Sequence, residues 1–254
     1  MEELESGENN EMIYALSDIH GCLDALEDAL AHIGDLAEIL SDDSENLLIF
    51  LGDYVDGGSD SAATLRRIYD IQQRYPGHVV VLKGNHDEWL LDFLTTDEPI
   101  LTTNYTSETL TSFLPESSTK FLPKCNLEEN LIQIRHYILV HYSWLVPWLE
   151  SMPLYFKTKT QVFVHAGIDE DAGELWELGT SEDVMLNKYP PTTGPFLIDV
   201  IAGHNGSCQL AEDPDFHGVY FDGKSHYFID GTVLISHRIP VLTYDITTGK
   251  YSSL

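Results

Sequence analysis

A short apolar run followed at once by a glycine-rich acidic loop is the feature that most constrains how this chain can fold. Residues Leu47 to Leu51 form the run, and Gly52-Asp53-Tyr54-Val55-Asp56-Gly57-Gly58 follows it directly. Five consecutive apolar residues are typical of a buried strand. The carboxylates of Asp53 and Asp56 therefore leave the carboxyl end of a strand, where ligands bind in open α/β sheets. Because Asp and Gly are also ordinary turn residues, this loop alone does not distinguish a ligand site from a plain turn.

Four further polar motifs each follow a strand-like apolar run. They are Asp18-Ile19-His20-Gly21, Gly84-Asn85-His86-Asp87, His165-Ala166-Gly167 and Gly203-His204. Apolar residues at helical spacing predict helices over residues 23–33 and 59–74. Three strand-loop-helix units in succession predict a largely parallel sheet with right-handed crossovers, so the motifs should meet at one edge.

The alternation of strands and helices stops between about residues 95 and 160. The stretch from Thr95 to Ser118 is rich in Thr, Ser and acidic residues, and a helical pattern follows from Leu127 to Trp148. We interpret residues 95–160 as a helical cap inserted into a single domain that spans residues 1–254. Near the end of the chain, turn dipeptides at Asp222-Gly223 and Thr248-Gly249 predict antiparallel strands that belong to a second sheet.

Charge and cysteine content exclude several classes of function. The chain has 42 acidic and 13 basic residues, a formal net charge of −29, which argues against a nucleic-acid partner and favours binding of divalent cations. Three scattered cysteines do not make a disulfide framework, so a reducing compartment is expected. No apolar run is long enough to span a membrane, and no signal peptide is visible. We expect a cytoplasmic protein without a membrane partner.

Eight polar residues at the predicted strand ends form a candidate metal and catalytic site. They are Asp18, His20, Asp53, Asp56, Asn85, His86, His165 and His204. A single histidine after a strand is more often a core residue than a ligand, but five motifs that all supply metal-binding groups favour a metal site. Mixed imidazole and oxygen ligands suit Mn, Fe or Zn better than Mg or Ca. Two such ions about 3.5 to 4 Å apart, bridged by Asp53, could hold a hydroxide that attacks a phosphoryl group. His86 could then protonate the leaving group, with its ring oriented by Asp56.

Together these motifs resemble the calcineurin-like metallophosphoesterases, and most of all their phosphoprotein phosphatase branch, which includes small bacterial and phage enzymes. The resemblance covers Ser17 to Asp230 apart from the cap. It implies a four-layer α/β/β/α sandwich of two mixed sheets and a site for two divalent transition-metal ions, Mn ahead of Fe or Zn. By this resemblance Asp18, His20, Asp53 and His204 would bind one ion, Asp53, Asn85 and His165 the other, and His86 with Asp56 would be the acid pair.

The chain departs from the pattern of this branch at Gly57, where the related phosphatases usually have an arginine that grips the substrate phosphate. Glycine cannot replace a bidentate guanidinium, and losing one charged hydrogen bond costs about 1.5 to 3 kcal/mol. A second phosphate-binding arginine of the family falls near Lys188, which is therefore a candidate substrate-binding residue.

These observations leave three functions open. The first is a metal-dependent phosphomonoesterase similar to the serine/threonine protein phosphatases, with a phosphoprotein as substrate. The second is a hydrolase of dinucleoside polyphosphates, for which the altered Gly57 position and the aromatic residues of the cap are suited. The third is a metal-binding module without catalytic activity, which the complete set of ligands argues against.

Overall fold

A computed structural model of the protein describes residues 11–96, 106–115 and 127–254. The strands of these residues form two five-stranded sheets, sheet A in the order β10-β9-β1-β2-β3 and sheet B in the order β4-β5-β6-β8-β7. Sheet A contains β1 (Met12–Leu16), β2 (Leu47–Phe50), β3 (Val79–Val81), β9 (Leu242–Asp245) and β10 (Lys250–Ser253). Sheet B contains β4 (Tyr155–Lys157), β5 (Gln161–Val164), β6 (Asp199–Gly206), β7 (Tyr220–Phe221) and β8 (His226–Asp230).

Parallel pairing at the centre of each sheet agrees with the sequence. Strands β1, β2 and β3 are parallel neighbours, as the three strand-loop-helix units predicted. In sheet B, β5, β6 and β8 are parallel neighbours, and β7 and β8 form the antiparallel pair predicted around Asp222-Gly223. Both sheets are therefore mixed.

The last two strands lie in a different sheet from the one that we predicted. We expected the C-terminal strands in the second sheet, but β9 pairs antiparallel with β1, with Tyr244 opposite Ile13, and β10 pairs with β9. Strand β1 pairs with β2 along one edge, and β9 pairs with its other edge. Without β9, the backbone N–H and C=O groups of that second edge would have no strand to bond. Leu242 of β9 also packs between the two sheets.

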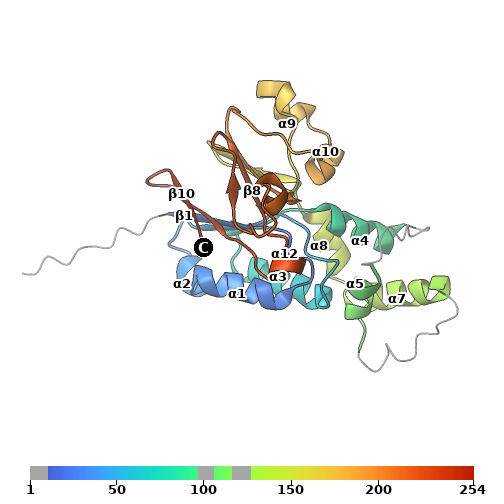
Figure 1. Cartoon of the computed structure of the whole chain (residues 1–254). Coiled ribbons are helices and arrows are strands. Elements are labelled where there is room, and N and C mark those ends of the chain that lie inside the picture. Colours follow the sequence, from blue (N-terminus) through green and yellow to red (C-terminus); the bar gives the residue numbers. More distant parts are fainter. Residues whose placement is uncertain (1–10, 97–105, 116–126) are drawn as a thin grey trace, which may run out of the picture.

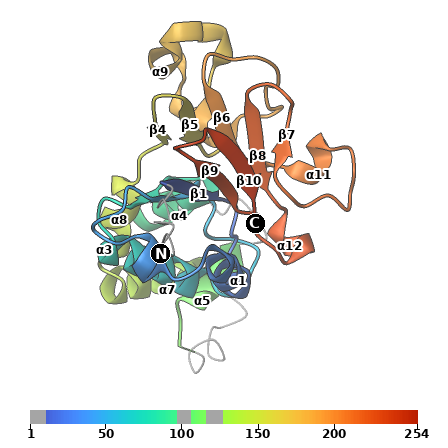
Figure 2. The same cartoon turned by 90° about the vertical axis from the view of Figure 1, so that its left-hand side faces the viewer.

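Helices cover the outer face of each sheet and make the four layers that we predicted. The helices on the side of sheet A include α1 (Leu23–Ile33), α3 (Ser61–Arg74) and α4 (Asn85–Thr95). On the side of sheet B are η1 (Glu170–Leu175), α9 (Trp176–Gly179) and α10 (Glu182–Asn187). Figures 1 and 2 show α9 on one side of the sheets and α1 with α3 on the other. Short helices α2 (Leu36–Ile39), α11 (Ser207–Leu210) and α12 (Val233–Ser236) lie in the connections.

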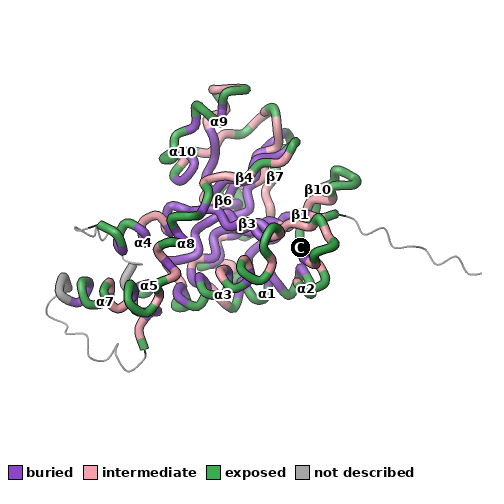
Figure 3. Tube along the Cα trace, turned by 180° about the vertical axis from the view of Figure 1, so that it is seen from behind, coloured by how far each residue is buried: buried purple, intermediate pink, exposed green. Residues whose placement is uncertain are grey.

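The core lies on both faces of both sheets, as Figure 3 shows by the buried segments through its centre. Along β2, Leu48 and Phe50 face the helices while Ile49 faces sheet B. Along β5, Phe163 faces sheet A while Val162 faces α9 and α10. Successive side chains of a strand point to opposite faces, so a strand covered on both sides reads as a continuous apolar run.

The predicted insertion contributes to the same core as α1 and α3. Its described helices are α5 (Thr106–Ser112), α7 (Leu127–His141) and α8 (Leu145–Ser151). Part of its Thr- and Ser-rich stretch lies outside the described residues, and its last residues form β4, which pairs with β5. Trp148 of α8 is buried, and its indole N–H donates to Gln72 Oε1 of α3 at 2.7 Å. No helix among the described residues is both long enough and apolar enough to cross a bilayer.

If residues 1–254 fold as one domain, Trp148→Ala should destabilise the whole chain in a single transition. Truncation of a buried Trp costs about 3 to 5 kcal/mol, and Gln72 would also lose its partner. Urea unfolding followed by circular dichroism measures this. Ile132→Ala, at a side chain of α7 that is 57% exposed, is the matched control and should change stability by about 0.5 kcal/mol or less. Two separate transitions would contradict the single-domain interpretation.

Candidate metal centre

The predicted side chains converge on Asp53, as the parallel strands require. Backbone hydrogen bonds tie the first two loops together, because the N–H groups of Ile19 and His20 both donate to the Asp53 carbonyl at 2.9 Å. The carboxylate of Asp87 then ties α4 to the second loop, since it accepts from the backbone N–H groups of Gly84, Asp53 and Tyr54 at 2.8 to 3.1 Å. The sequence motif contained Asp87, but its positioning role was not predicted.

Backbone strain is concentrated in these loops. Five site residues have φ in the left-handed region: Asp18 (55°), His20 (48°), Asp53 (59°), Asp56 (72°) and His204 (62°). Only a few per cent of residues other than glycine adopt such values, and each costs of order 1 to 3 kcal/mol. Strained residues of this kind gather at binding and catalytic sites, so the backbone supports a functional role for this cluster.

The two carboxylate oxygens of Asp53 face different groups. Oδ1 lies 3.4 Å from His165 Nε2 and accepts from the backbone N–H of His86 at 3.0 Å. Oδ2 lies 3.8 Å from His20 Nε2 and 3.9 Å from His86 Nε2. Burial opposes ionisation of this carboxyl, but the surrounding histidine rings lower the pKa of Asp53. A carboxylate with one oxygen on each side is suited to bridge two cations.

Asp18 and His20 form the first side of the centre. His20 Nδ1 donates to the Val55 carbonyl at 3.0 Å, which directs Nε2 towards Asp18 Oδ1, 4.0 Å away. Burial and the charges of Asp230 and Asp53 raise the pKa of Asp18. A divalent cation between these carboxylates would relieve their repulsion, so the donor set fits a metal ion.

His165, Asn85 and His204 form the second side. His165 is fully buried, with Nδ1 2.9 Å from the Leu51 carbonyl and Nε2 2.9 Å from Asn85 Oδ1. Burial lowers the pKa of His165 to about 4, so the imidazole is neutral, as a metal ligand must be. Ligand atoms of Asp53, His165 and His204 lie within 4.8 Å of one another. This grouping differs from the one that the resemblance implied, because only the backbone N–H of His204 contacts Asp18.

His86 and Asp56 form the hydrogen-bonded pair that we expected. The distance from His86 Nδ1 to Asp56 Oδ2 is 2.8 Å, and the ring packs at 4.3 Å against Trp89. Nε2 of His86 faces the centre, near Asp53 Oδ2. Burial opposes a charged ring, but the hydrogen bond to Asp56 and the charge of Asp53 raise the pKa of His86. The arrangement suits a proton donor at Nε2, a role that stays a prediction.

The ammonium of Lys188 is held by groups other than the eight residues of the centre. It forms an ion pair with Glu170 and donates to the Ile168 carbonyl at 2.5 Å. Glu170 also lies 3.4 Å from His226 Nε2, and His226 Nδ1 lies 3.3 Å from Asp222 Oδ2. The substrate-binding role of Lys188 stays a prediction, and it would require the ammonium to leave Glu170.

Leu234 and Asp230 lie beside the centre, but neither of them was identified from the sequence. A Cβ on Gly57 would lie 2.5 Å from Leu234 Cδ1, so this leucine of α12 occupies the space where the family's arginine would begin. Asp230, at the end of β8, is buried and adds its charge to that of Asp18. The rule that polar residues after apolar runs mark the site could have identified Asp230, since Phe228 and Ile229 precede it.

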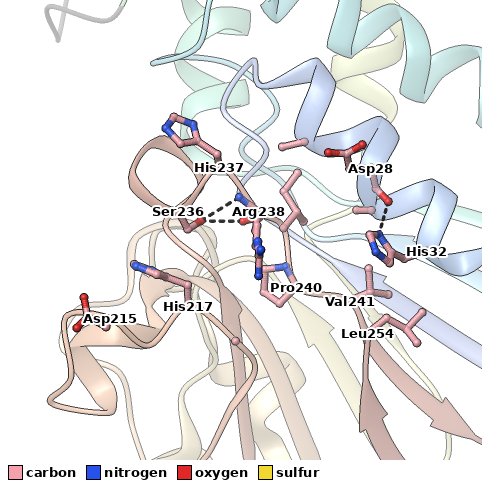
Figure 4. A pocket seen from close by; sticks show the side chains of 14 residues that line it. Asp28, His32, Asp215, His217, Ser236, His237, Arg238, Pro240, Val241 and Leu254 are labelled. Atoms are coloured by element: carbon pink, nitrogen blue, oxygen red, sulfur yellow. Dashed lines mark hydrogen bonds between the residues drawn. The ribbon is translucent and has the colours of Figure 1, made fainter.

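A cavity of about 770 Å³ lies next to α12, between α1 and the loop over residues 236–241. None of the eight residues of the centre lines it; Figure 4 shows His32, His217, His237 and Arg238 at its walls. His217 Nδ1 lies 2.7 Å from Thr232 Oγ1, and the Thr232 N–H donates to Asp230, so the cavity wall is linked to the centre. Within the part of the chain that the structure describes, the guanidinium of Arg238 forms no ion pair.

Comparison with known families and curated proteins points to phosphoester chemistry. A family model described as calcineurin-like phosphoesterase matches residues 12–207. A symmetrical bis(5'-nucleosyl)-tetraphosphatase of Nitrosococcus oceani is 24% identical over 208 residues, 81% of this chain and 60% of the relative. One from Legionella pneumophila (strain Corby) is 40% identical over 86 residues, 34% of this chain and 28% of that protein. The serine/threonine-protein phosphatase SIT4 of Candida albicans is 37% identical over 70 residues, 28% of this chain and 21% of that protein. The chain thus spans less than two thirds of each relative.

Solved structures share the fold. A mutant of a cold-active protein tyrosine phosphatase superposes with a TM-score of 0.61 at 16% identity, covering 96% of this chain and 80% of that chain. A protein serine/threonine phosphatase of Saccharomyces cerevisiae with similarity to human PP5 gives 0.58 at 13% identity, covering 98% and 81%. At such identities the likeness concerns the fold alone.

The cluster around Lys188 predicts a pH-dependent stability at His226. Burial disfavours the charged ring, but Glu170 and Asp222 raise the pKa of His226 above its usual value, despite the nearby Lys188 ammonium. The stability that the protonated ring contributes is complete below about pH 6.5 and is lost as the pH rises through the raised pKa. His226→Gln should therefore destabilise the protein most at low pH.

Urea unfolding across this pH range measures the difference between His226→Gln and the unsubstituted protein. His136→Gln, at an exposed position of α7, serves as control and should show a small difference that does not vary with pH. A destabilisation by His226→Gln that grows as the pH rises would contradict the assignment of a protonated ring.

Proposed function

Because the chain belongs to the calcineurin-like phosphoesterase family, we propose that this centre hydrolyses phosphoesters with two divalent transition-metal ions, Mn ahead of Fe or Zn. The two-sided environment of Asp53 carries the proposal. We assign Asp18, His20 and Asp53 to one ion, and Asp53, Asn85, His165 and His204 to the other. Such ions, when bound, offset charge on phosphoryl oxygens and lower the pKa of water.

His86 supplies the proton that the leaving group needs. Its Nδ1 is engaged by Asp56, so the proton to be transferred is held at Nε2, on the side of the ring that faces Asp53. Transfer from Nε2 to the leaving oxygen leaves a neutral ring, while Asp56 keeps the ring oriented and stabilises its charged form before transfer. Ligand atoms of His86, His20 and Asp53 also lie within 4.8 Å of one another. We assign His86 as the proton donor rather than a ligand because Asp56 holds its Nδ1.

For the substrate we place dinucleoside polyphosphates first. The relatives that are named bis(5'-nucleosyl)-tetraphosphatases include the one that matches 81% of this chain. Leu234 fills the place of a guanidinium that would hold a phosphate beside Gly57, so the chain departs here from the phosphoprotein phosphatase pattern. Our sequence analysis had placed a phosphomonoester first. A phosphoprotein is the second candidate, favoured by the 37% identity to the Candida phosphatase over 70 residues.

The cavity beside α12 supports a substrate with two nucleotide halves. Its volume of about 770 Å³ falls within the range of about 300 to 1,000 Å³ that is usual for ligand pockets. Arg238 is exposed at the wall of this cavity and is available for a phosphate. We propose that one nucleotide half is bound there while the scissile phosphoanhydride bond lies at the metal centre.

His86→Asn should lower turnover of phenyl phosphate by about 10²- to 10⁴-fold, the usual contribution of a general acid or base. Metal content, measured by plasma mass spectrometry after loading with Mn, should stay unchanged. His141→Asn, at an exposed histidine of α7, should affect neither quantity. Loss of metal in parallel with activity would make His86 a ligand, and absence of hydrolysis by the unsubstituted protein with Mn, Fe, Zn and Co would refute the hydrolase proposal.

Diadenosine tetraphosphate should be hydrolysed with a higher kcat/KM than a phosphoserine peptide. Arg238→Ala should raise KM for diadenosine tetraphosphate by about tenfold or more, since a charged hydrogen bond contributes about 1.5 to 3 kcal/mol. Its kinetics on p-nitrophenyl phosphate should not change, and Lys250→Ala, at an exposed lysine of β10, should alter neither substrate. A preference for the phosphopeptide would favour the second candidate. If Arg238→Ala left KM for diadenosine tetraphosphate unchanged, the proposal that the cavity binds part of the substrate would be wrong.

A further inference from the structure

A threonine from the predicted insertion contacts the partner of His86. Thr109 of α5 is 1% exposed, and its Oγ1 lies 2.5 Å from Asp56 Oδ1. The backbone N–H of Asp56 donates to the same Oγ1 at 3.1 Å. Thr109 thus holds Asp56 at both its side chain and its backbone, across 53 residues of sequence.

Hydrogen-bond directions around Thr109 are determined by its partners. An ionised carboxylate only accepts, so the Thr109 hydroxyl proton points to Asp56 Oδ1. The lone pairs of Oγ1 then accept from the Asp56 N–H and from the Ser61 hydroxyl, whose oxygen is 3.3 Å away. All of these groups are buried, so replacing the hydroxyl would deprive Asp56 Oδ1 of this hydrogen bond, whereas the Asp56 N–H would keep the Ser61 hydroxyl oxygen at 3.4 Å as acceptor.

The same helix also docks on the start of α3. Ser112 Oγ accepts from the backbone N–H of Ala62 at 3.0 Å, which satisfies one of the N–H groups that a helix leaves free in its first turn. The loop from Asp56 to Ala62 is therefore held at two points by α5. Asp56 has a φ of 72°, and a residue in this strained conformation persists only where its surroundings fix it.

We propose that Thr109 is a positioning residue, which holds the Asp56 carboxylate so that its other oxygen, Oδ2, meets His86 Nδ1 at 2.8 Å. The hydroxyl of Thr109 bonds Asp56 and Ser61 and none of the proposed metal ligands, so we infer that it acts through Asp56. This inference rests on the proposed function, in which His86 protonates the leaving group. It makes the predicted insertion a part of the proton-transfer apparatus.

Thr109→Val, which removes the hydroxyl at nearly constant shape, tests the proposal with two aryl phosphates in the Mn-loaded protein. Phenyl phosphate has a basic leaving group that needs a proton, whereas p-nitrophenyl phosphate has one that leaves readily without it. Thr109→Val should lower kcat on phenyl phosphate by at least about tenfold. This is less than the full contribution of a general acid, about 10²- to 10⁴-fold, because His86 itself remains. The kcat on p-nitrophenyl phosphate should fall far less, and KM for both should be unchanged.

Two further variants serve as controls. Thr109→Ser keeps the hydroxyl and should restore the rate on phenyl phosphate. Thr111→Val lies on the same helix and should leave both rates unchanged, because among the described residues the Thr111 hydroxyl bonds only the Glu108 carbonyl. An equal loss on both substrates, or a failure of Thr109→Ser to restore the rate, would show that Thr109 is merely structural and would overturn the proposal. Thr109→Ala replaces the valine variant if that does not fold.

A proton NMR measurement tests the contact without hydrolysis. The His86 Nδ1–H that donates to Asp56 should give a low-field signal, assigned by its absence in His86→Asn. In Thr109→Val this signal should shift upfield or broaden, while it should remain in Thr111→Val. An unchanged signal in Thr109→Val would overturn the proposal. If the unsubstituted protein hydrolyses no phosphoester, the proposed function fails, yet the NMR result still decides whether Thr109 positions Asp56.

Discussion

The buried carboxylate of Asp53 is the group on which the rest of the structure depends. It lies in a chain with a net charge of −29 and shares a buried region with Asp18 and Asp230. Burying several like charges is costly unless cations or hydrogen bonds compensate them. Histidine rings and the His86 N–H provide part of the compensation. Divalent cations would provide the remainder, so folding stability and metal affinity are linked at this centre.

Close approach between loops explains why glycine accompanies the ligands. A Cβ on Gly84 would lie 2.2 Å from Asp53 Oδ1, and a Cβ on Gly203 would lie 2.1 Å from Asp18 Oδ2. These glycines are thus required by the space that the carboxylates occupy, and no larger residue fits without moving a ligand. Several ligand residues have φ in the strained left-handed region. The strands packed on both faces and the three hydrogen bonds to the Asp87 carboxylate hold the backbone in this conformation. Rigid support from two sheets holds the ligand atoms together.

Local patterns predicted the order of the central strands and the residues that gather at their ends, because both follow from apolar periodicity and parallel pairing. Those patterns do not indicate which residues far apart in the sequence contact each other. A hairpin pattern predicts that β9 and β10 pair with each other, but not that β9 lies beside β1. The place of His204 depends on an irregularity of β6 between Ala202 and Gly206, which turns the ring towards His165. Thr109 lies in a stretch with few apolar residues, so nothing in its neighbourhood indicated a buried contact with Asp56.

The metal ligands and the groups that orient Asp56 come from different parts of the chain, so substitutions can affect one set without the other. The groups that we assign to the metal ions all come from the loops and strand ends of the sandwich and from the first turn of α4, whereas the orientation of Asp56 depends on α5. Substitutions in α5 can therefore alter proton donation while the ligands stay in place, because the side chains of Thr109 and Ser112 bond the loop from Asp56 to Ala62 and not the ligand residues. Leaving groups that need no proton would be little affected by such changes, and basic leaving groups would be strongly affected. An insertion that supports the acid pair thus offers a route to a different substrate range without rebuilding the metal centre.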